Sequence, residues 1–132
     1  MNEFKLNYLH ICDIAFLSEN KKANIIGIFK VIYSSTFPMA YPKFSVIISL
    51  DTNPIITKGN HKLQLKLIRM SDGKENNQIV NVDFEVSTDQ NEINFIVDIV
   101  NSIFEKQDKY NLITYVDNKE INRTAFEVVK TN

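Results

Sequence analysis

Residues 61–70 read HKLQLKLIRM, and leucine occupies positions 63, 65 and 67. Successive side chains of a β-strand point to opposite faces of the sheet, so this alternation puts the three leucines on one face. Lys62, Gln64 and Lys66 fall on the other face. The stretch therefore predicts a strand with one face in an apolar core and the other in water.

A hairpin turn is expected directly after this strand, at Ser71-Asp72-Gly73-Lys74. Asp-Gly is a strong turn signal because both residues tolerate a positive φ angle. The alternation then resumes, with an inward face made of Val80, Val82, Phe84 and Val86. We therefore predict a second strand over 80–86, whose polar residues point outward.

The pattern continues along the rest of the chain. β-branched and aromatic residues dominate, and turn residues interrupt them about every eight to twelve residues, which is typical of an all-β sandwich or barrel. Further strands are expected at 4–17, 23–33, 44–51, 110–117 and 121–129, with connections at 18–22, 34–43 and 52–60. Gly27 lies inside one of these strands, which indicates a bulge or a close backbone approach. The last two strands should form a hairpin across Asp117-Asn118-Lys119.

Residues 93–104 fit two patterns. Their apolar residues could form one face of a helix, with the polar residues behind it. β-branched residues dominate the stretch, however, and these favour a strand. We expect a strand there. The whole chain, 1–132, is then predicted to be a single all-β domain, a two-layer antiparallel β-sandwich of about seven to nine strands, with immunoglobulin-like strand order preferred over a jelly roll.

Composition and charge exclude several classes of protein. The chain has 132 residues, with 15 basic and 16 acidic side chains and a formal charge of −1. A domain of this length can hold a core without disulfides or metal. The near-zero charge provides no field that gathers nucleic acid, so no nucleic-acid partner is expected. No apolar stretch approaches the roughly 18 residues of a membrane span, so no membrane association is expected either.

The compartment is predicted from the same sequence. Cys12 is the only cysteine, which excludes an internal disulfide and favours a reducing compartment. The first residues lack a basic run followed by an apolar stretch, so we expect no signal peptide. The protein is therefore predicted to be cytoplasmic. Its abundant Ile, Asn and Lys and scarce Ala and Arg are typical of an AT-rich bacterial or phage genome.

Several motifs together resemble a known family. They are Cys12-Asp13, Asn24-Ile25-Ile26-Gly27-Ile28-Phe29, Phe37-Pro38, Pro42-Lys43-Phe44, His61-Lys62-Leu63, Asp72-Gly73-Lys74, Tyr110 and Tyr115-Val116-Asp117. From about Phe4 to Val129 the chain resembles a family of small bacterial proteins that is known only as a domain of unknown function. The resemblance implies a compact β-sandwich and carries no catalytic residues. The chain departs from it at Lys22, Lys109 and Asn118, where glycine would be expected.

Candidate catalytic groups are few. His10 and Cys12 share one strand face and could act as base and nucleophile, but a cysteine on an apolar face is more often a small buried hydrophobe. A zinc site would need two further ligands, and glycines at only 27, 59 and 73 leave no phosphate-binding loop. We therefore expect no catalytic residues, no metal and no cofactor.

The best candidate for a contact site is the segment 33–44. It carries four aromatic residues and a methionine beside Pro38 and Pro42, namely Tyr33, Phe37, Met39, Tyr41 and Phe44. Rigid aromatic side chains on a proline-stiffened loop lose little conformational entropy on binding. The alternative is that the segment crosses between the two sheets and plugs the open end of the sandwich.

Self-association is a further expectation. The strands predicted around Ile25–Tyr33, Val46–Ile48 and Ile93–Val100 are apolar on both faces, although the outer face of a sandwich should be polar. Each large aliphatic side chain that stays in water forgoes roughly 1.5–3 kcal/mol. A loop or a second copy of the chain should cover this surface, so a homodimer is predicted.

Three functions are compatible with the sequence. The first is a non-catalytic binding or assembly module that contacts an unknown protein or small-molecule partner through 33–44. The second is a phage or mobile-element protein that sequesters a nucleotide signal, for which the loose basic group is Lys43, Lys58, Lys62, Lys66 and Arg69. The third is an enzyme of unknown class that uses His10 and Cys12.

Overall fold

The computed structural model describes residues 3–76 and 80–132. Over these residues the chain forms nine strands and one short helix. In chain order they are β1 (Lys5–Leu17), β2 (Ala23–Ile28), β3 (Val31–Ser34), β4 (Met39–Asp51), α1 (Pro54–Thr57), β5 (Gly59–Arg69), β6 (Val80–Val86), β7 (Glu92–Phe104), β8 (Asp108–Val116) and β9 (Lys119–Lys130). None of the helices in this part of the chain is long and apolar enough to cross a membrane.

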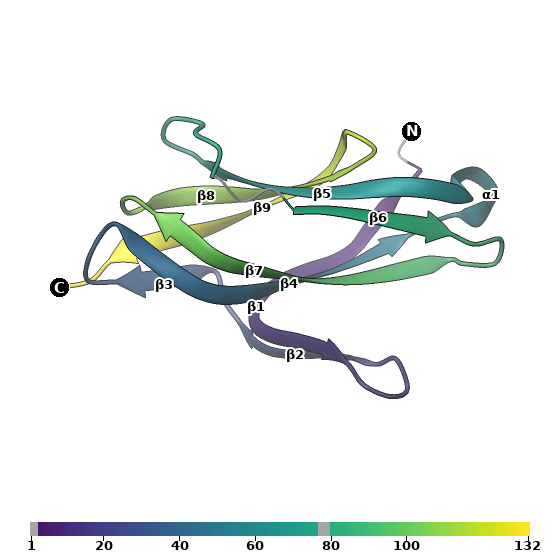
Figure 1. The fold of residues 1–132 in the computed structure, drawn as a ribbon, viewed down its shortest axis with the longest axis horizontal. Coiled ribbons are helices and arrows are strands. Elements are labelled where there is room, and N and C mark those ends of the chain that lie inside the picture. Colours follow the sequence, from purple (N-terminus) through teal and green to yellow (C-terminus); the bar gives the residue numbers. More distant parts are fainter. Residues whose placement is uncertain (1–2, 77–79) are drawn as a thin grey trace.

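The strands form two layers. One sheet has the order β2-β1-β4-β7 and the other β3-β9-β8-β5-β6, and the two lie face to face (Figure 1). All described strand pairs are antiparallel except β3 with β9. In the first sheet β4 lies between β1 and β7, as immunoglobulin strand B lies between A and E, and in the second β8 lies between β5 and β9, as F lies between C and G. The predicted two-layer sandwich with immunoglobulin-like order is confirmed.

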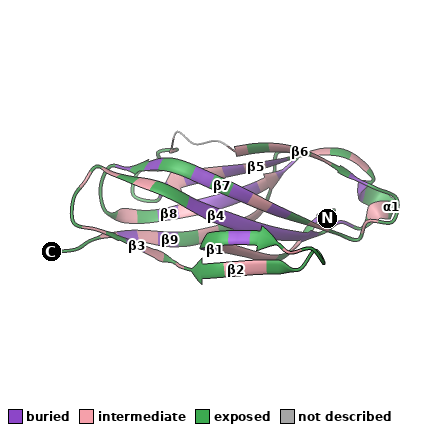
Figure 2. Cartoon of the chain, turned by 60° about the horizontal axis from the view of Figure 1, so that its bottom comes forward, coloured by how far each residue is buried: buried purple, intermediate pink, exposed green. Residues whose placement is uncertain are grey.

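The core lies between the sheets. The leucine row of β5 faces inward as predicted, since Leu63, Leu65 and Leu67 are at most 2% exposed. Opposite them β4 contributes its own row of fully buried residues, Phe44, Val46, Ile48 and Leu50. Figure 2 shows this burial along β4 and the mostly exposed β2 at the sheet edge. The leucine alternation of β5 therefore marks residues that pack in the core between the sheets.

Both predicted turns are present. Asp117 and Asn118 have φ angles of 50° and 67°, and they form the two-residue loop between β8 and β9. Two successive positive φ angles match the right-handed twist of the flanking strands. Gly73 has a φ of 70° and its N–H donates to the carbonyl of Arg69 over 2.8 Å. The strand expected over 93–104 is likewise confirmed, because β7 pairs with β4 along its length.

The single strand predicted over 23–33 is wrong. The chain leaves the first sheet after Phe29, whose N–H donates to the carbonyl of Ile11 over 3.0 Å. It joins the second sheet at Lys30, whose carbonyl accepts from the N–H of Glu127 over 2.9 Å. β2 and β3 therefore belong to different sheets. The second apolar face of the segment stays largely in water, since Ile26 and Ile28 are 56% and 54% exposed.

The predicted connections are shorter than expected. The loop predicted at 34–43 spans only 35–38, and Met39 already begins β4. Pro42 lies inside β4 at a point where the pairing with β7 passes from Tyr41 to Lys43. Proline has no N–H to donate, so it is tolerated where the ladder is interrupted. The connection expected at 52–60 includes the helix α1, which the sequence did not predict.

Candidate functional site

The structure separates the five residues predicted as a contact site. Phe44 is 0% exposed and lies in the core, so it offers no surface to a partner. Phe37, Met39 and Tyr41 are partly buried against the same core. Tyr33, on the edge strand β3, is 66% exposed. The segment crosses from the second sheet to the first, the course expected for the alternative role as a plug.

Tyr33 and Tyr41 nevertheless share a hollow. It has a volume of about 360 Å³ and lies beside the place where the chain crosses from β2 to β3. Its described lining residues are Asp13, Gly27, Ile28, Phe29, Val31, Ile32, Tyr33 and Tyr41. The hollow therefore lies where four strands meet: β1, the end of β2, the edge strand β3 and the start of β4.

The acidic end of the hollow depends on a glycine. Gly27 has a φ of +72°, and a Cβ atom placed on it would lie 2.8 Å from Cγ of Asp13. Real Cβ atoms do not approach a carboxyl carbon so closely, so the side chain of Asp13 occupies the space that any other residue at 27 would fill. The close backbone approach that the sequence suggested at Gly27 is therefore an approach of the Asp13 side chain.

The aromatic end of the hollow is rigidly packed. The rings of Phe29 and Tyr41 stack at 6.1 Å with an interplanar angle of 23°, and both meet the Phe44 ring edge-on. Burial raises the pKa of the Tyr41 hydroxyl, and the negative charge of Asp13 raises it further. The hydroxyl therefore stays protonated at neutral pH. Phe44 supports the hollow from within the core without lining it.

Asp13, Gly27 and Phe29 were not predicted as site residues. Gly27 carried a signal, since a glycine inside an apolar strand often marks a close approach. The only signal at Asp13 was its position next to Cys12 in one of the motifs that resemble the family. Nothing in the spacing of these residues indicates that β1, β2 and β3 converge.

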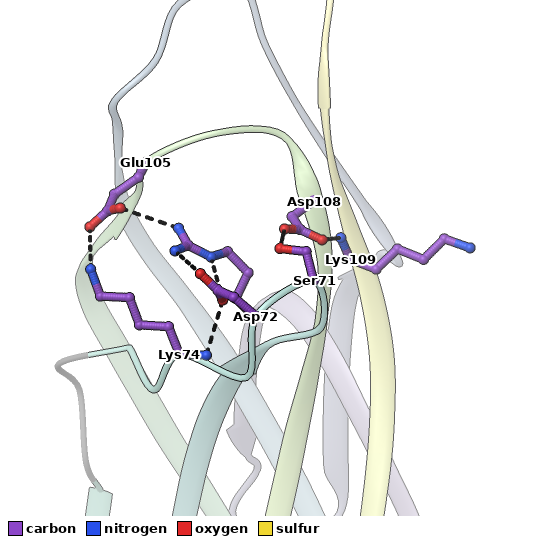
Figure 3. A network of polar contacts seen from close by, with 7 residues as sticks. Ser71, Asp72, Lys74, Glu105, Asp108 and Lys109 are labelled. Atoms are coloured by element: carbon purple, nitrogen blue, oxygen red, sulfur yellow. Dashed lines mark hydrogen bonds and ion pairs between the residues drawn. The ribbon is translucent and has the colours of Figure 1, made fainter.

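A second hollow, of about 400 Å³, lies at one end of the sandwich. Its described lining residues are Arg69, Lys74, Glu75, Asn76, Asn101, Ile103, Glu105 and Tyr110. Arg69 donates to both carboxylate oxygens of Asp72, over 3.0 and 2.6 Å, and to Glu105 over 3.2 Å. Lys74 also reaches Glu105, over 3.0 Å (Figure 3).

This network neutralises its own charges. The hydrogen bonds from Arg69 hold the pKa of Asp72 well below its usual range, and those from Lys74 and Arg69 lower the pKa of Glu105. Two carboxylates already occupy the donors of the guanidinium, so Arg69 is committed to the fold rather than to an anionic ligand. The network ties the turn after β5 to the end of β7.

The residues of the enzyme hypothesis are not arranged for catalysis by a thiolate. Cys12 is 0% exposed and its thiol donates to the carbonyl of Ser45 over 3.6 Å. Burial raises the pKa of this thiol, and the charges of Asp13 and Asp98 raise it further, so the reactive thiolate is disfavoured. The His10 ring stacks on Tyr8 at 5.6 Å. Across 3–76 and 80–132, no three His, Cys, Asp or Glu side chains are grouped to hold a metal ion.

The basic residues of the nucleotide hypothesis do not converge. Lys43 pairs with Asp98 over 3.6 Å on the first sheet. Lys62 and Lys66 lie on the outer face of β5, where the Lys66 ammonium sits 5.3 Å from the centre of the Tyr115 ring. Arg69 lies on the opposite face of β5, the face that carries the buried leucines.

Solved structures resemble this chain in fold. The alkylpurine DNA glycosylase AlkC of Pseudomonas fluorescens matches 98% of the chain with a TM-score of 0.57 and 9% identity. A β-glucosidase from Listeria innocua matches 96% with a TM-score of 0.51 and 10% identity. The chain spans only 31% of the glycosylase and 16% of the glucosidase. An immunoglobulin-like protein from Pseudomonas aeruginosa matches with a TM-score of 0.45 and 12% identity, over 97% of this chain and 98% of its own.

At the level of sequence the assignment comes from a family model. The sequence has no significant match among curated proteins. The model of the Family of unknown function (DUF6941) matches residues 7–129. The match covers nearly all of the described sandwich, and the chain therefore belongs to this family of unknown function.

Proposed function

We propose that this protein is a non-catalytic binding module whose contact site is the hollow beside the β2–β3 crossing. The observation that carries the proposal is the meeting of exposed Tyr33, partly buried Tyr41 and the Asp13 carboxylate around one concave surface. Its volume of about 360 Å³ lies within the usual range of ligand sites, roughly 300–1,000 Å³. The lining combines aromatic and aliphatic side chains with a carboxylate and two phenol groups, and a few polar groups of this kind fix the orientation of a ligand.

The contact site is narrower than the sequence suggested. Tyr33 and Tyr41 remain from the predicted segment 33–44, whereas Phe44 only supports their packing. The likeness to parts of a DNA glycosylase and a glucosidase concerns the fold alone. Their catalytic activities are not proposed for this chain.

A fragment screen by NMR tests the proposal. A library of small polar-aromatic molecules is added to isotope-labelled protein, and backbone shifts are followed. Fragments should shift the amides of Gly27, Phe29 and Tyr33 together. Tyr33→Ala should weaken this binding about tenfold while leaving the melting temperature within a degree or so of wild type, because the side chain is 66% exposed.

A matched control is Tyr115→Ala, on β8 of the same sheet as Tyr33 and outside the residues that line the hollow, which should leave fragment binding unchanged. Fragments that gather on another surface, or a library in which none binds the hollow, would refute the proposal.

Self-association is a second candidate role, favoured by the edge strand β2. Ile14 and Ile26 pair across the β1–β2 ladder and are 48% and 56% exposed, and Phe16 is 46% exposed. Within the described part of the chain, no strand pairs with the outer edge of β2. A free edge with apolar side chains is a template for another strand, and antiparallel pairing with a second copy closes as a symmetric dimer.

Light scattering at micromolar concentration checks the dimer. A species of twice the 15.3 kDa chain mass is expected, and Ile26→Lys should return it to the monomer. Wild-type protein that stays at the monomer mass would exclude the dimer.

The compartment and origin also stay proposals. We infer a cytoplasmic bacterial or phage protein, and the single cysteine, which is buried, is consistent with a reducing compartment. The nucleotide-sequestering alternative gains no support from the dispersed lysines.

A further inference from the structure

We propose that the hollow beside the β2–β3 crossing binds an organic cation, an alkylated ammonium group held between the Asp13 carboxylate and the rings of Phe29, Tyr33 and Tyr41. This inference rests on the proposed function and names the ligand class of the same site. It follows from three features of the hollow: its charge, its aromatic walls and the space that Gly27 leaves.

The charge of the hollow is a single negative one. Among its described lining residues Asp13 is the only Asp, Glu, Lys, Arg or His. No ion pair joins its carboxylate to a lysine, arginine or histidine of the described chain. Lys30 lies in the crossing itself but does not line the hollow. A cation entering the hollow therefore meets an uncompensated carboxylate, and an anion is repelled by it.

The aromatic walls select the kind of cation. The faces of aromatic rings carry negative electrostatic potential and attract cations that lie within about 6 Å of the ring centre. Phe29 and Tyr41 provide two stacked rings, and Tyr33 provides a third with most of its surface free. The remaining walls are aliphatic, from Ile28, Val31 and Ile32. These aliphatic side chains favour a cation that carries methyl groups over a strongly hydrated ion.

One carboxylate does not make a metal site. Calcium takes six to eight oxygen ligands, and magnesium retains its waters unless several oxygens replace them. The hollow supplies one carboxylate and two phenol groups on its described walls. A carboxylate beside several rings is instead the arrangement that recognises methylated ammonium groups.

Gly27 connects the charge to the walls. Its missing side chain lets the Asp13 carboxyl lie directly over the β2 backbone. Any larger residue at 27 would displace the carboxyl group and occupy part of the hollow. The Asp13 carboxylate therefore lines the hollow in the space that a Cβ at residue 27 would fill.

Titration with a matched pair of probes tests the inference. Choline is compared by NMR with its neutral isostere, in which carbon replaces the ammonium nitrogen, so the two differ in charge at nearly equal shape. Choline should bind at the hollow at least about tenfold more tightly than the isostere. A third probe, trimethyl-lysine with both ends blocked, carries the same group on a peptide side chain. If choline binds more tightly than blocked trimethyl-lysine, the ligand is a free small molecule. If trimethyl-lysine binds more tightly, the ligand is a methylated side chain of a protein.

Variants assign the effect to the carboxylate. Asp13→Asn keeps the shape of the side chain and should weaken choline binding about tenfold while leaving the isostere unchanged. Asp83→Asn, on the exposed face of β6, is the matched control and should change neither. Melting temperatures of both variants verify that each is folded.

Equal affinity for choline and its isostere, or full choline affinity in folded Asp13→Asn protein, would overturn the cation inference. The proposed function would survive either result, because the fragment screen decides independently whether the hollow binds ligands. Absence of any binding by both cations would also overturn the cation inference alone.

Discussion

The Nδ1 atom of His61 lies 2.6 Å from the Oδ2 atom of Asp117, which joins the start of β5 to the turn between β8 and β9. The other ring nitrogen, Nε2, contacts the backbone carbonyl of Thr57 in α1. Both partners accept hydrogen bonds, so the arrangement favours the protonated imidazolium form, in which both ring nitrogens donate. The rings of Phe4 and Phe84 pack around the imidazole, with their centres 4.9 and 5.5 Å from its centre.

The stability of the fold should therefore depend on pH through His61. Burial lowers the pKa of its imidazole, but the hydrogen bonds to Asp117 and Thr57 and the charges of Asp117 and Glu3 outweigh burial and raise it above 6.5. A raised pKa in the folded state means that this stabilisation is fully present below pH 6.5 and is lost as the pH rises through the folded-state pKa. Urea denaturation across this range should show the free energy of unfolding falling with pH.

The control for this prediction is His61→Gln. It should remove the pH dependence and lower the free energy of unfolding at pH 6 by about 1–2 kcal/mol, since the hydrogen bonds of the imidazole to Asp117 and Thr57 are lost. Asp117 acts at acidic pH. Burial raises the pKa of its carboxyl group, but the hydrogen bonds with His61 and with the Lys62 N–H outweigh burial and lower the pKa below 3.8. The stabilisation that the Asp117 carboxylate provides is therefore lost as the pH falls through that lowered pKa. An unchanged alkaline profile in the variant would contradict the role assigned to His61.

Gly27→Ala should destabilise the protein more than Gly73→Ala. Both glycines have positive φ angles, +72° and +70°, so both substitutions strain the backbone by about 1 kcal/mol. Only the new Cβ at 27 would meet a neighbour, the Asp13 carboxyl group, whereas nothing lies within 4 Å at Gly73. We expect a total loss of about 2–3 kcal/mol at 27, measured by urea denaturation. Equal losses at the two sites would show that the Asp13 contact carries no cost.

Ile47→Ala should cost about 2–4 kcal/mol although Ile47 points to the outer face of its sheet. Ile47 is 0% exposed and packs with Cys12 and Ala15 in a cluster separate from the main core, covered by partly buried Tyr8 and Ile96. The matched control is Ile14→Ala on the same sheet, where the side chain is 48% exposed and the loss should stay below about 1 kcal/mol. Similar losses in both variants would mean that the outer cluster does not pack as a second core.

Cys12 should react slowly with a thiol reagent in the native protein. Its side chain is fully buried and its pKa is raised, so the thiolate is both scarce and shielded. We expect labelling at neutral pH at least about a hundredfold slower than in concentrated urea. Native labelling as fast as that of the unfolded chain would place the thiol at the surface and reopen the question of a reactive cysteine.

Several elements could be predicted because they are local. The leucines of β5, the strand over 93–104 and the Asp117-Asn118 turn follow from side-chain alternation and from residues that tolerate positive φ. These properties belong to a few consecutive residues. The strand order could be preferred from the same pattern because few two-layer arrangements bury such strands.

The sequence by itself determined that the chain forms alternating strands, that Leu63, Leu65 and Leu67 of β5 face the core, and that Gly27 marks a close approach inside an apolar segment. Only the tertiary structure decided that 23–33 divides between two sheets, that Phe44 is buried while Tyr33 is exposed, and that Asp13 meets Phe29 and Tyr41. The physical reason is that the crossing at Phe29 and Lys30 is created by hydrogen bonds to Ile11 and Glu127, residues far away in the chain. A periodic pattern reports which face a residue takes in its own strand, and not which strand lies across from it.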